Sequence, residues 1–461
     1  MPFRVRGMNL VPKWEYVVLF VGDVGVFGLS LWATLALRYL ELPSAELYLR
    51  HLVPFSLLFV VWTAVFFLAG LYGKHTRLFR SKLPMTIFYT QILNILLAAL
   101  FFFFIPAFGL APKTILILYL LVSSVLVYLW RVFVFTRLPT LLAGRKLRGI
   151  LVASGPDARA LSEEIANDPR YPFEFEHIID TAHAPHHEVI QRACRLAAED
   201  DMTFLVVDFS DKAFEKARPI IYNAAFNKER FAIIDVVELY QEVFDRVPLS
   251  LIQYEWVLAS VNSSRLYALL KRSVDIIGSI VLGLLSLIVY PFVALAIKLE
   301  DGGPIFISQK RVGRYQKGIQ VIKFRSMTGN DRGEYGPGGK TKLSVTKVGR
   351  FLRRSRIDEL PQLWAVLKGD LSLVGPRPEF PALSEEYSAK ISYYDARYLL
   401  PPGLTGWAQI KHDRHPHHGT DIAETKTKLS YDLYYLKHRS LLLDLFIILQ
   451  TIRIMLTARG S

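Results

Sequence analysis

The sequence predicts a membrane protein in three parts. These are a four-helix transmembrane bundle (1–140), a Rossmann-like α/β middle domain with a degenerate fingerprint (145–258) and an α/β monotopic domain with a re-entrant helix (265–461). Of the 461 residues, 52% are hydrophobic and only 21% are charged, which is too apolar for an ordinary water-soluble protein. Disordered and collagen-like chains are excluded, and the single cysteine, Cys194, excludes an internal disulfide scaffold.

Charge separates the same three parts. Net charge is +8 over residues 1–144, −6 over 145–270 and +12 over 271–461, which gives +14 for the chain. A basic balance is typical of proteins that meet nucleic acid, an anionic membrane surface or a phosphorylated substrate. Because the middle part is acidic, such anionic partners are expected at the first and third parts.

Four apolar stretches fill the first part, and each approaches the ~20 residues that a helix needs to cross a bilayer. They are Tyr16–Leu37, Leu52–Leu71, Met85–Phe104 and Ile115–Phe135. Their length and number are unlike a cleaved signal peptide. Trp14, Trp62 and Trp130 are expected near the membrane interfaces.

Basic residues predict the orientation of the bundle. They gather before the first stretch, in the second loop and after the fourth stretch: Arg4, Arg6, Lys13, Lys74, Arg77, Arg80, Lys82, Arg137, Arg145, Lys146 and Arg148. Positive loops tend to remain inside, so both ends of the bundle and everything after it are expected in the cytoplasm.

Asp23 lies within the first apolar stretch, beside Gly22 and Gly25. An intramembrane carboxylate can mark a transport site. Asp23 has no evident basic partner at the same depth, so a structural or interfacial position is expected instead.

Strands alternate with a helix in the middle part, which predicts a parallel α/β domain. The strands are expected at 149–154, 204–208 and 231–236, and the helix at 157–166. A dinucleotide fingerprint would follow the first strand, but Gly155-Pro156-Asp157 lacks its later glycines, and proline removes an amide donor. A regulatory or assembly role is the preferred interpretation.

A long apolar run opens the third part. Pro291 interrupts it, and a proline bends a helix because it removes one hydrogen bond. The segment 271–299 is therefore expected to enter the membrane and return on the same side. The basic residues that follow it favour this interpretation over a fifth span.

Adjacent carboxylates, Asp358 and Glu359, stand at the start of a helix that is expected to run through Lys368. The basic residues Arg350, Arg353, Arg354 and Arg356 precede them. Arginine partners and a helix N-terminus lower carboxylate pKa values, so both groups are expected to be ionised. An ionised aspartate can serve as nucleophile or metal ligand, although for the dipeptide alone a solvated capping pair is the preferred interpretation.

The surrounding motifs resemble a known family. In order, they are QKRVG, KFRSM, RSRIDELPQLW, GDLSLVGPRPE and PPGLTGWAQ, within residues 265–461. Together they resemble the bacterial sugar transferases, and the order of the three parts is similar to the large polyprenyl-phosphate phosphoglycosyl transferases. These enzymes start exopolysaccharide, capsule or O-antigen repeat units at the bacterial inner membrane.

This resemblance implies that the third part is catalytic. It implies transfer of a sugar 1-phosphate from a UDP-sugar to undecaprenyl phosphate, with release of UMP and with Mg²⁺ as cofactor. Asp358 would be nucleophile and metal ligand, and Glu359 its dyad partner. Phosphate or substrate binding would fall to Arg353, Arg377, Lys323, Arg325 and Glu379. Membrane lipid is an expected partner, nucleic acid is not, and a homodimer is left open.

Other features have weaker signals. A histidine-rich patch (412–418) fits no standard zinc spacing, and a glycine-rich loop (329–341) is a candidate lid. Leu441–Leu456 is expected to be an interfacial helix. A rival interpretation, a nucleotide-sugar dehydratase or epimerase, would use Tyr267 and Lys271, whose spacing matches its catalytic pair but which abut the re-entrant segment. A non-enzymatic scaffold would require a dead dyad.

Overall fold

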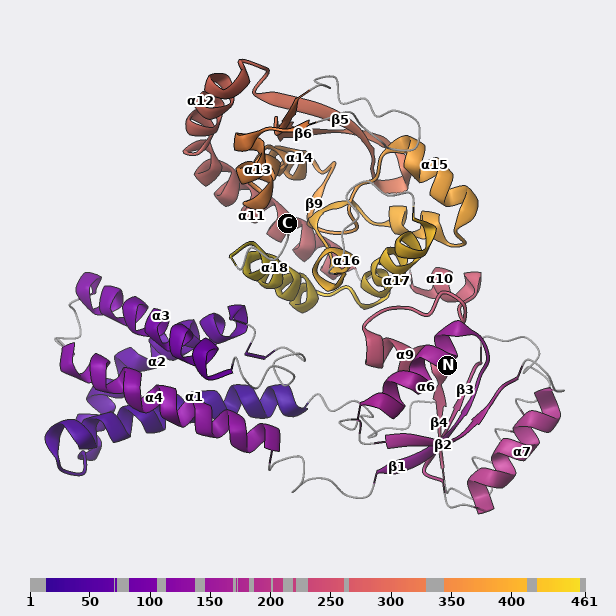
Figure 1. Cartoon of the computed structure of the whole chain (residues 1–461), viewed down its shortest axis with the longest axis horizontal. Coiled ribbons are helices and arrows are strands. Elements are labelled where there is room, and N and C mark those ends of the chain that lie inside the picture. Colours follow the sequence, from indigo (N-terminus) through magenta and orange to yellow (C-terminus); the bar gives the residue numbers. More distant parts are fainter. Residues whose placement is uncertain are drawn as a thin grey trace. The chain divides into compact units, whose positions relative to one another are not determined.

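The computed structural model separates a unit within residues 8–146 from a second that contains 147–461 (Figure 1). Each is described by itself. The described residues are 14–69, 71–72, 83–105, 113–136, 146–168, 171, 173–181, 186–199, 202–209, 219–220, 231–260, 265–328, 344–412 and 421–456. The glycine-rich loop, the basic second loop of the bundle and the histidine-rich patch beyond His412 lie outside them.

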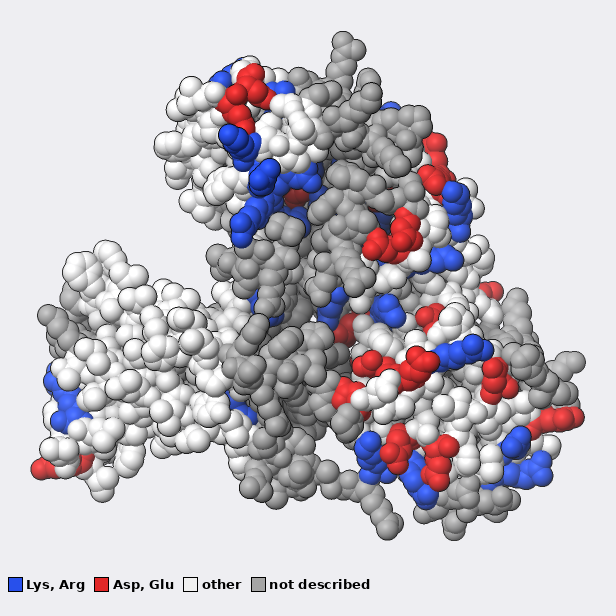
Figure 2. Space-filling view, viewed as in Figure 1, with Lys and Arg blue, Asp and Glu red and all other residues white. Residues whose placement is uncertain are grey.

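Within the described residues, the first unit contains four helices, each with an apolar stretch long enough to cross a membrane. They are α1 (Trp14–Tyr39), α2 (Ala45–Leu68), α3 (Leu83–Phe104) and α4 (Lys113–Thr136). The second helix begins earlier than expected because the Ser44 side chain accepts a hydrogen bond from the Leu47 amide as an N-cap. Figure 2 shows that the visible face of this unit is almost without charge.

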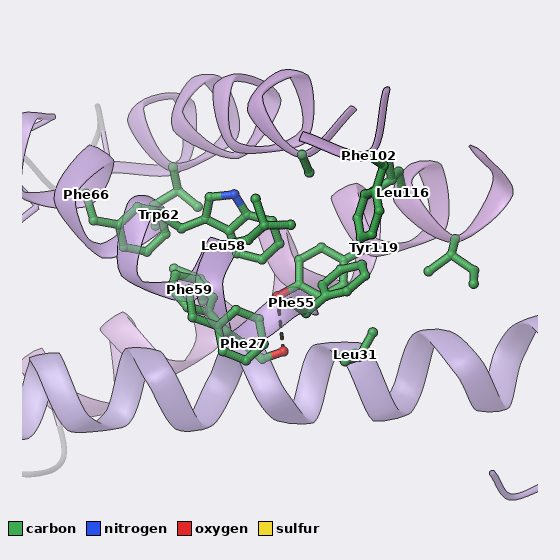
Figure 3. Close-up of a cluster of buried hydrophobic side chains, with 14 of the residues drawn as sticks. Phe27, Leu31, Phe55, Leu58, Phe59, Trp62, Phe66, Phe102, Leu116 and Tyr119 are labelled. Carbon is green, nitrogen blue, oxygen red and sulfur yellow. Dashed lines mark hydrogen bonds between the residues drawn. The ribbon is translucent and has the colours of Figure 1, made fainter. Parts of the chain in front are cut away.

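Aromatic side chains fill the interior of this bundle (Figure 3). The Tyr119 hydroxyl donates to the Phe27 carbonyl oxygen at 3.0 Å. Trp62 is fully buried, and its indole Nε1 donates to the Asn94 carbonyl oxygen at 3.0 Å. The expected interfacial position of Trp62 is therefore wrong: this indole joins α2 to α3 inside the bundle.

Asp23 is not alone at its depth, which corrects the sequence-based expectation. Its Oδ2 atom forms an ion pair with Arg131 of α4 and accepts a hydrogen bond from the Tyr72 hydroxyl at 2.7 Å. Asp23 and Arg131 are both fully buried. Arg131 also donates to the Leu71 carbonyl oxygen at 2.7 Å, so one guanidinium links α1, α4 and the end of α2. The structural interpretation of Asp23 accounts for these contacts.

The second unit begins with a four-stranded parallel sheet. Its order is β2-β1-β3-β4, formed by β1 (Leu147–Val152), β2 (Phe173–Ile179), β3 (Phe204–Val207) and β4 (Ala232–Asp235). The predicted strands are present. The edge strand β2 was missed, because its sequence alternates charged with apolar residues as a half-exposed strand does.

Helices cover this sheet and lead to the third part (Figure 1). They are α6 (Pro156–Asn167), α7 (His186–Glu199), α9 (Val236–Phe244) and α10 (Tyr254–Ser260). At the start of α6, Asp157 Oδ2 accepts hydrogen bonds from the amide and hydroxyl of Ser250, at 3.0 and 2.6 Å. The chain's own turn thus meets the helix end where a nucleotide phosphate would bind in an intact fingerprint.

The apolar run of the third part forms two helices, α11 (Arg265–Leu287) and α12 (Tyr290–Asp301), with a bend of 52° between them. The break falls just before Pro291, which lies in the first turn of α12, where its missing amide costs nothing. Arg272 donates to the Val366 and Leu367 carbonyl oxygens, both at 2.7 Å. Asp275, buried on the same helix, accepts from the Leu373 amide at 3.1 Å.

The rest of this part follows α12 in the chain. It consists of a hairpin, β5 (Phe306–Val312) and β6 (Gly318–Phe324); two short pairs, β7 (Met327–Thr328) with β8 (Ser344–Val345) and β9 (Ser372–Val374) with β10 (Gly403–Thr405); the helices α13 (Lys347–Arg354), α14 (Leu363–Lys368), α15 (Pro381–Lys390), α16 (Trp407–Lys411), α17 (Ile422–His438) and α18 (Leu441–Leu456); and 3₁₀ helices at Arg314–Gln316, Ile357–Gln362 and Tyr394–Leu399. α18 has the predicted bounds. It buries Ile447 and Asp444 and exposes Leu442 and Leu445.

The buried pair in the bundle predicts a stability effect. Removing one partner of a buried ion pair typically costs about 3–5 kcal/mol, because the other charge stays uncompensated. Arg131→Met and Asp23→Leu should each lower the unfolding temperature of the purified protein in detergent, followed by circular dichroism. The double variant should recover most of the lost unfolding temperature. A double variant that unfolds no higher than the less stable single variant would contradict the pairing.

Candidate active site

The two adjacent carboxylates lie on the 3₁₀ helix Ile357–Gln362, which continues directly into α14. Pro361 predicts that a helix begins here, and the structure confirms one, but its first turns have the tighter 3₁₀ geometry. Arg356, just before it, has a positive φ of 55° and turns the chain between α13 and the 3₁₀ helix. Asp358 is only 8% exposed. This carboxylate is therefore held inside the fold rather than solvated, which removes the interpretation as a solvated capping pair.

Glu359 gathers the basic side chains of the site. Its carboxylate lies 2.9 Å from Arg377 Nη2, 3.6 Å from Lys323 Nζ and 3.7 Å from Arg356 Nη1. Arg377 donates a hydrogen bond in this contact. These cations come from β6, from the segment before the 3₁₀ helix and from the turn after β9. Glu359 thus joins three separate segments.

Asp358 has a different environment from its neighbour. Within the ranges that the structure describes, no hydrogen bond or ion pair to its carboxylate is present, although Lys323, Arg377 and Arg353 are near enough to act electrostatically. Burial, and then the adjacent Glu359 charge, raise the pKa of Asp358 to about 6. The expectation that both carboxylates have lowered pKa values is therefore wrong for Asp358.

For Glu359 that expectation is confirmed. Burial by itself would raise its pKa, but Arg377, then Lys323 and Arg356, hold it well below the usual range. Burial lowers the pKa of Lys323 to about 8, and the Glu359 charge opposes that shift. The two adjacent acids therefore differ: Glu359 remains an anion, whereas Asp358 changes its charge near pH 6.

The remaining predicted site residues fall in different places. Arg353, on α13, acts electrostatically on Asp358, and its Nη1 lies 3.2 Å from the Met327 sulfur. Arg325 is buried and paired with Asp301 at 2.7 Å, so it braces the end of α12 and does not join the Glu359 cluster. Glu379, two residues after Arg377, lies 3.8 Å from Arg397 Nη1.

The GPRP and PPGLTG motifs contact each other at a glycine residue. Strand β9 leads into GPRP and β10 lies within PPGLTG, and they pair in parallel, with the Gly375 amide donating to the Thr405 carbonyl oxygen at 2.8 Å. A side chain at Gly375 would meet the Pro401 carbonyl oxygen at 2.4 Å. Only glycine permits this approach. The spacing of these motifs therefore reflects one local packing arrangement.

Sequence reasoning missed the contacts that support Arg377. The Pro378 carbonyl oxygen accepts from Arg311 at 3.2 Å, and that of Arg377 accepts from Arg397 at 3.0 Å. Arg311 lies in the QKRVG motif, which was a usable signal. Arg397 lies outside every motif, and no sequence pattern indicates it.

Tyr267 and Lys271, the pair that the rival interpretation requires, both face Asp444 of α18. The Tyr267 hydroxyl donates to Asp444 at 3.2 Å, and Lys271 Nζ lies 3.7 Å from the same carboxylate. Lys271 also pairs with Asp275 at 2.9 Å. These contacts join α11 to α18 and account for both side chains structurally.

No cluster of three or more histidine, cysteine or acidic side chains suited to a metal ion occurs among the described residues. Asp358 is nevertheless a buried carboxylate not occupied by a cation of the protein. Mg²⁺ is commonly bound by one or two carboxylates together with substrate phosphates. The residues at Asp358 fit that kind of site.

The chain is similar to known proteins over its third part. Residues 266–458 match the family model described as bacterial sugar transferase. A UDP-N-acetylgalactosamine-undecaprenyl-phosphate N-acetylgalactosaminephosphotransferase of Aeromonas hydrophila is 38% identical over 45% of this chain and 48% of its own length, so the match spans about half of that relative.

Shorter relatives are covered more completely. A UDP-glucose:undecaprenyl-phosphate glucose-1-phosphate transferase of Caulobacter vibrioides is 41% identical over 41% of this chain and 71% of its own length. An uncharacterized sugar transferase of Bacillus subtilis is 37% identical over 42% of this chain and 90% of its own length. With the five motifs placed around one buried acidic pair, these matches show that the chain belongs to the bacterial sugar transferase family.

Proposed function

We propose that the protein transfers a sugar 1-phosphate from a UDP-sugar to undecaprenyl phosphate. The observation that carries this proposal is the asymmetry of the acidic pair: Glu359 takes the cations, and the buried Asp358 beside it is left without a bound partner among the described residues. A carboxylate in that state is suited to attack phosphorus. The names of the Aeromonas and Caulobacter relatives support the substrate classes.

In the first step, an Asp358 carboxylate oxygen attacks the phosphorus that bears the sugar. The bond from that phosphorus to the bridging oxygen breaks, and UMP departs with this oxygen and its electron pair. The product is a sugar phosphate joined to Asp358 as an acyl phosphate, a mixed anhydride. Because Asp358 becomes protonated as pH falls through its raised pKa of about 6, this step should slow below that pH.

In the second step, a phosphate oxygen of undecaprenyl phosphate attacks the same phosphorus. The bond between Asp358 and phosphorus breaks, which restores the carboxylate and yields undecaprenyl diphosphate sugar. One pocket thus serves both steps, and each donor or acceptor occupies it in turn.

Arg377 and Lys323 are the proposed phosphate-binding groups. Both substrates are anionic, so charge that develops at the transferred phosphorus must be offset. Glu359 holds both cations in place beside Asp358, with Arg377 partly exposed at 39% and able to meet a diphosphate. Arg353 adds positive charge on the α13 side. Glu359 is thereby a positioning group rather than a second nucleophile.

Asp358 and the substrate diphosphate would together hold Mg²⁺, which fits the open carboxylate and the lack of a larger acidic cluster in the described ranges. When bound, the ion supplies charge neutralisation at the phosphate oxygens.

The bent helix pair is proposed to enter the membrane and return on the same side. Apolar side chains remain exposed on both of its arms: Ile277, Leu284, Leu285, Ile288, Phe292, Leu295 and Leu299. Arg272 attaches the first arm to α14, so a membrane-embedded α11 would hold the site beside lipid head groups. The basic loops favour a cytoplasmic site in the inner membrane. The product would start a polysaccharide repeat unit.

Removing the nucleophile tests this mechanism. Asp358→Asn should lower UMP release by roughly 10³-fold or more, because an amide neither attacks phosphorus nor becomes an anion. The measurement is UMP formation by the purified full chain with a panel of UDP-sugars, undecaprenyl phosphate and Mg²⁺. The panel also identifies the sugar.

Asp395→Asn is the matched control, since Asp395 is an exposed aspartate of the same part of the chain, bonded only locally to Ser388 in the described contacts. It should retain wild-type turnover. Near-wild-type turnover by Asp358→Asn would contradict the nucleophile, and no UMP release by the wild type with any sugar would favour the scaffold interpretation.

The shifted pKa values predict a bell-shaped pH profile of kcat/KM. Activity should fall as pH drops through about 6, where Asp358 becomes protonated, and as pH rises through about 8, where Lys323 loses its charge. Lys323→Arg should extend the alkaline limb, because arginine keeps its charge. A profile that stays flat through both values would refute these assignments.

A further inference from the structure

The segment that presents Arg377 is held almost entirely through its carbonyl oxygens. Pro376 and Pro378 flank Arg377 and have no amide hydrogen to donate. Four successive carbonyl oxygens, from Pro376 to Glu379, accept hydrogen bonds at 2.9, 3.0, 3.2 and 2.9 Å. Two of their donors are backbone amides, of Gly403 and Val312, and the others are the arginines already described.

The hydrogen bond to the Arg377 carbonyl oxygen is donated by Arg397, which lies in the 3₁₀ helix Tyr394–Leu399. We propose that Arg397 is a positioning residue: it fixes the Arg377 main chain so that the Arg377 guanidinium meets Glu359 and a bound diphosphate. The diphosphate in this inference rests on the proposed function. The contact between Arg397 and Arg377 does not.

Arg397 is itself rigidly held. It is 7% exposed, and its Nη2 lies 3.0 Å from Asp432 Oδ2 on α17, a side chain that is 3% exposed. Its Nη1 donates to the Tyr394 hydroxyl at 2.7 Å and lies 3.8 Å from Glu379. A guanidinium held by a buried carboxylate and a tyrosine hydroxyl keeps one geometry, so it can fix the position of the carbonyl that it contacts.

Arg377 needs this support more than its neighbours do. Its side chain is 39% exposed, and within the described part of the chain its polar contact is with Glu359. A long side chain of that exposure has considerable rotational freedom. The position of its main chain therefore decides how often the guanidinium meets Glu359, and the Arg397 bond is the contact made by the carbonyl of that same residue.

Arg397→Lys separates positioning from charge. Lysine retains the positive charge near Asp432 but has a single nitrogen, so it cannot make both the Nη1 contact with the Tyr394 hydroxyl and the Nη2 contact with the Arg377 carbonyl oxygen. The probe is binding of UDP with Mg²⁺ by calorimetry, alongside kcat and KM for transfer. A lost charge-assisted hydrogen bond predicts roughly 10- to 100-fold weaker UDP binding and lower kcat/KM.

A double-mutant cycle with Arg377→Ala decides whether Arg397 acts through Arg377. In the Arg377→Ala background, Arg397→Lys should cause no further loss in UDP affinity or kcat/KM, because the group being positioned is gone. Additive losses would overturn the inference and leave Arg397 a structural residue.

Ser384→Ala is the matched control for general destabilisation. Its hydroxyl shares a buried hydrogen bond with Tyr398 at 2.6 Å in the same region and touches neither arginine. This variant should lower the unfolding temperature without changing UDP affinity. If Arg397→Lys fails to fold, Tyr394→Phe, which removes the 2.7 Å hydroxyl contact, should give a smaller loss that likewise vanishes with Arg377→Ala.

A third readout needs no substrate. Phenylglyoxal should modify Arg377 faster in Arg397→Lys than in the wild type or Ser384→Ala, as measured by peptide mass spectrometry. If the wild type neither binds UDP nor transfers sugar phosphate, the proposed function fails, and the modification rate still decides this inference. Equal rates in all three proteins would overturn the inference even when transfer is present.

Discussion

The site depends on the neutralisation of Glu359 by Arg377, Lys323 and Arg356. Two adjacent buried carboxylates cannot both be ionised at low cost unless cations are supplied. The cations are divided unequally, so Glu359 stays an anion while the pKa of Asp358 rises to about 6. One carboxylate assembles the site, and the other remains available for chemistry.

That ion cluster is connected to the apolar helix pair by short, specific contacts. Arg272 of α11 binds the carbonyl oxygens at the end of α14, and Asp275 binds the start of the β9 region. Because α14 continues the 3₁₀ helix that carries the acidic pair, the position of α11 determines that of the pair. A proposed lipid acceptor and a proposed nucleotide donor can then share one pocket.

The sequence predicted the features that depend on local pattern. Hydrophobic length predicted the four apolar helices, β-propensity three of the parallel strands, and Pro291 the bend after α11. It could not predict contacts between distant segments, such as Asp23 with Arg131. The unequal division of cations between Asp358 and Glu359 was missed for the same reason, as was the pairing of Arg325 with Asp301. Periodicity and motif spacing describe single segments, whereas these charges are placed by tertiary packing.

The proposed function depends on a covalent bond between Asp358 and the sugar phosphate. The most direct measurement is the mass of the full chain after incubation with the accepted UDP-sugar and Mg²⁺ but without undecaprenyl phosphate. We expect an added sugar 1-phosphate on the peptide that contains Asp358, stoichiometric UMP, and loss of the adduct when undecaprenyl phosphate is supplied. Absence of an adduct, with UMP released only when both substrates are present, would contradict it in favour of direct transfer.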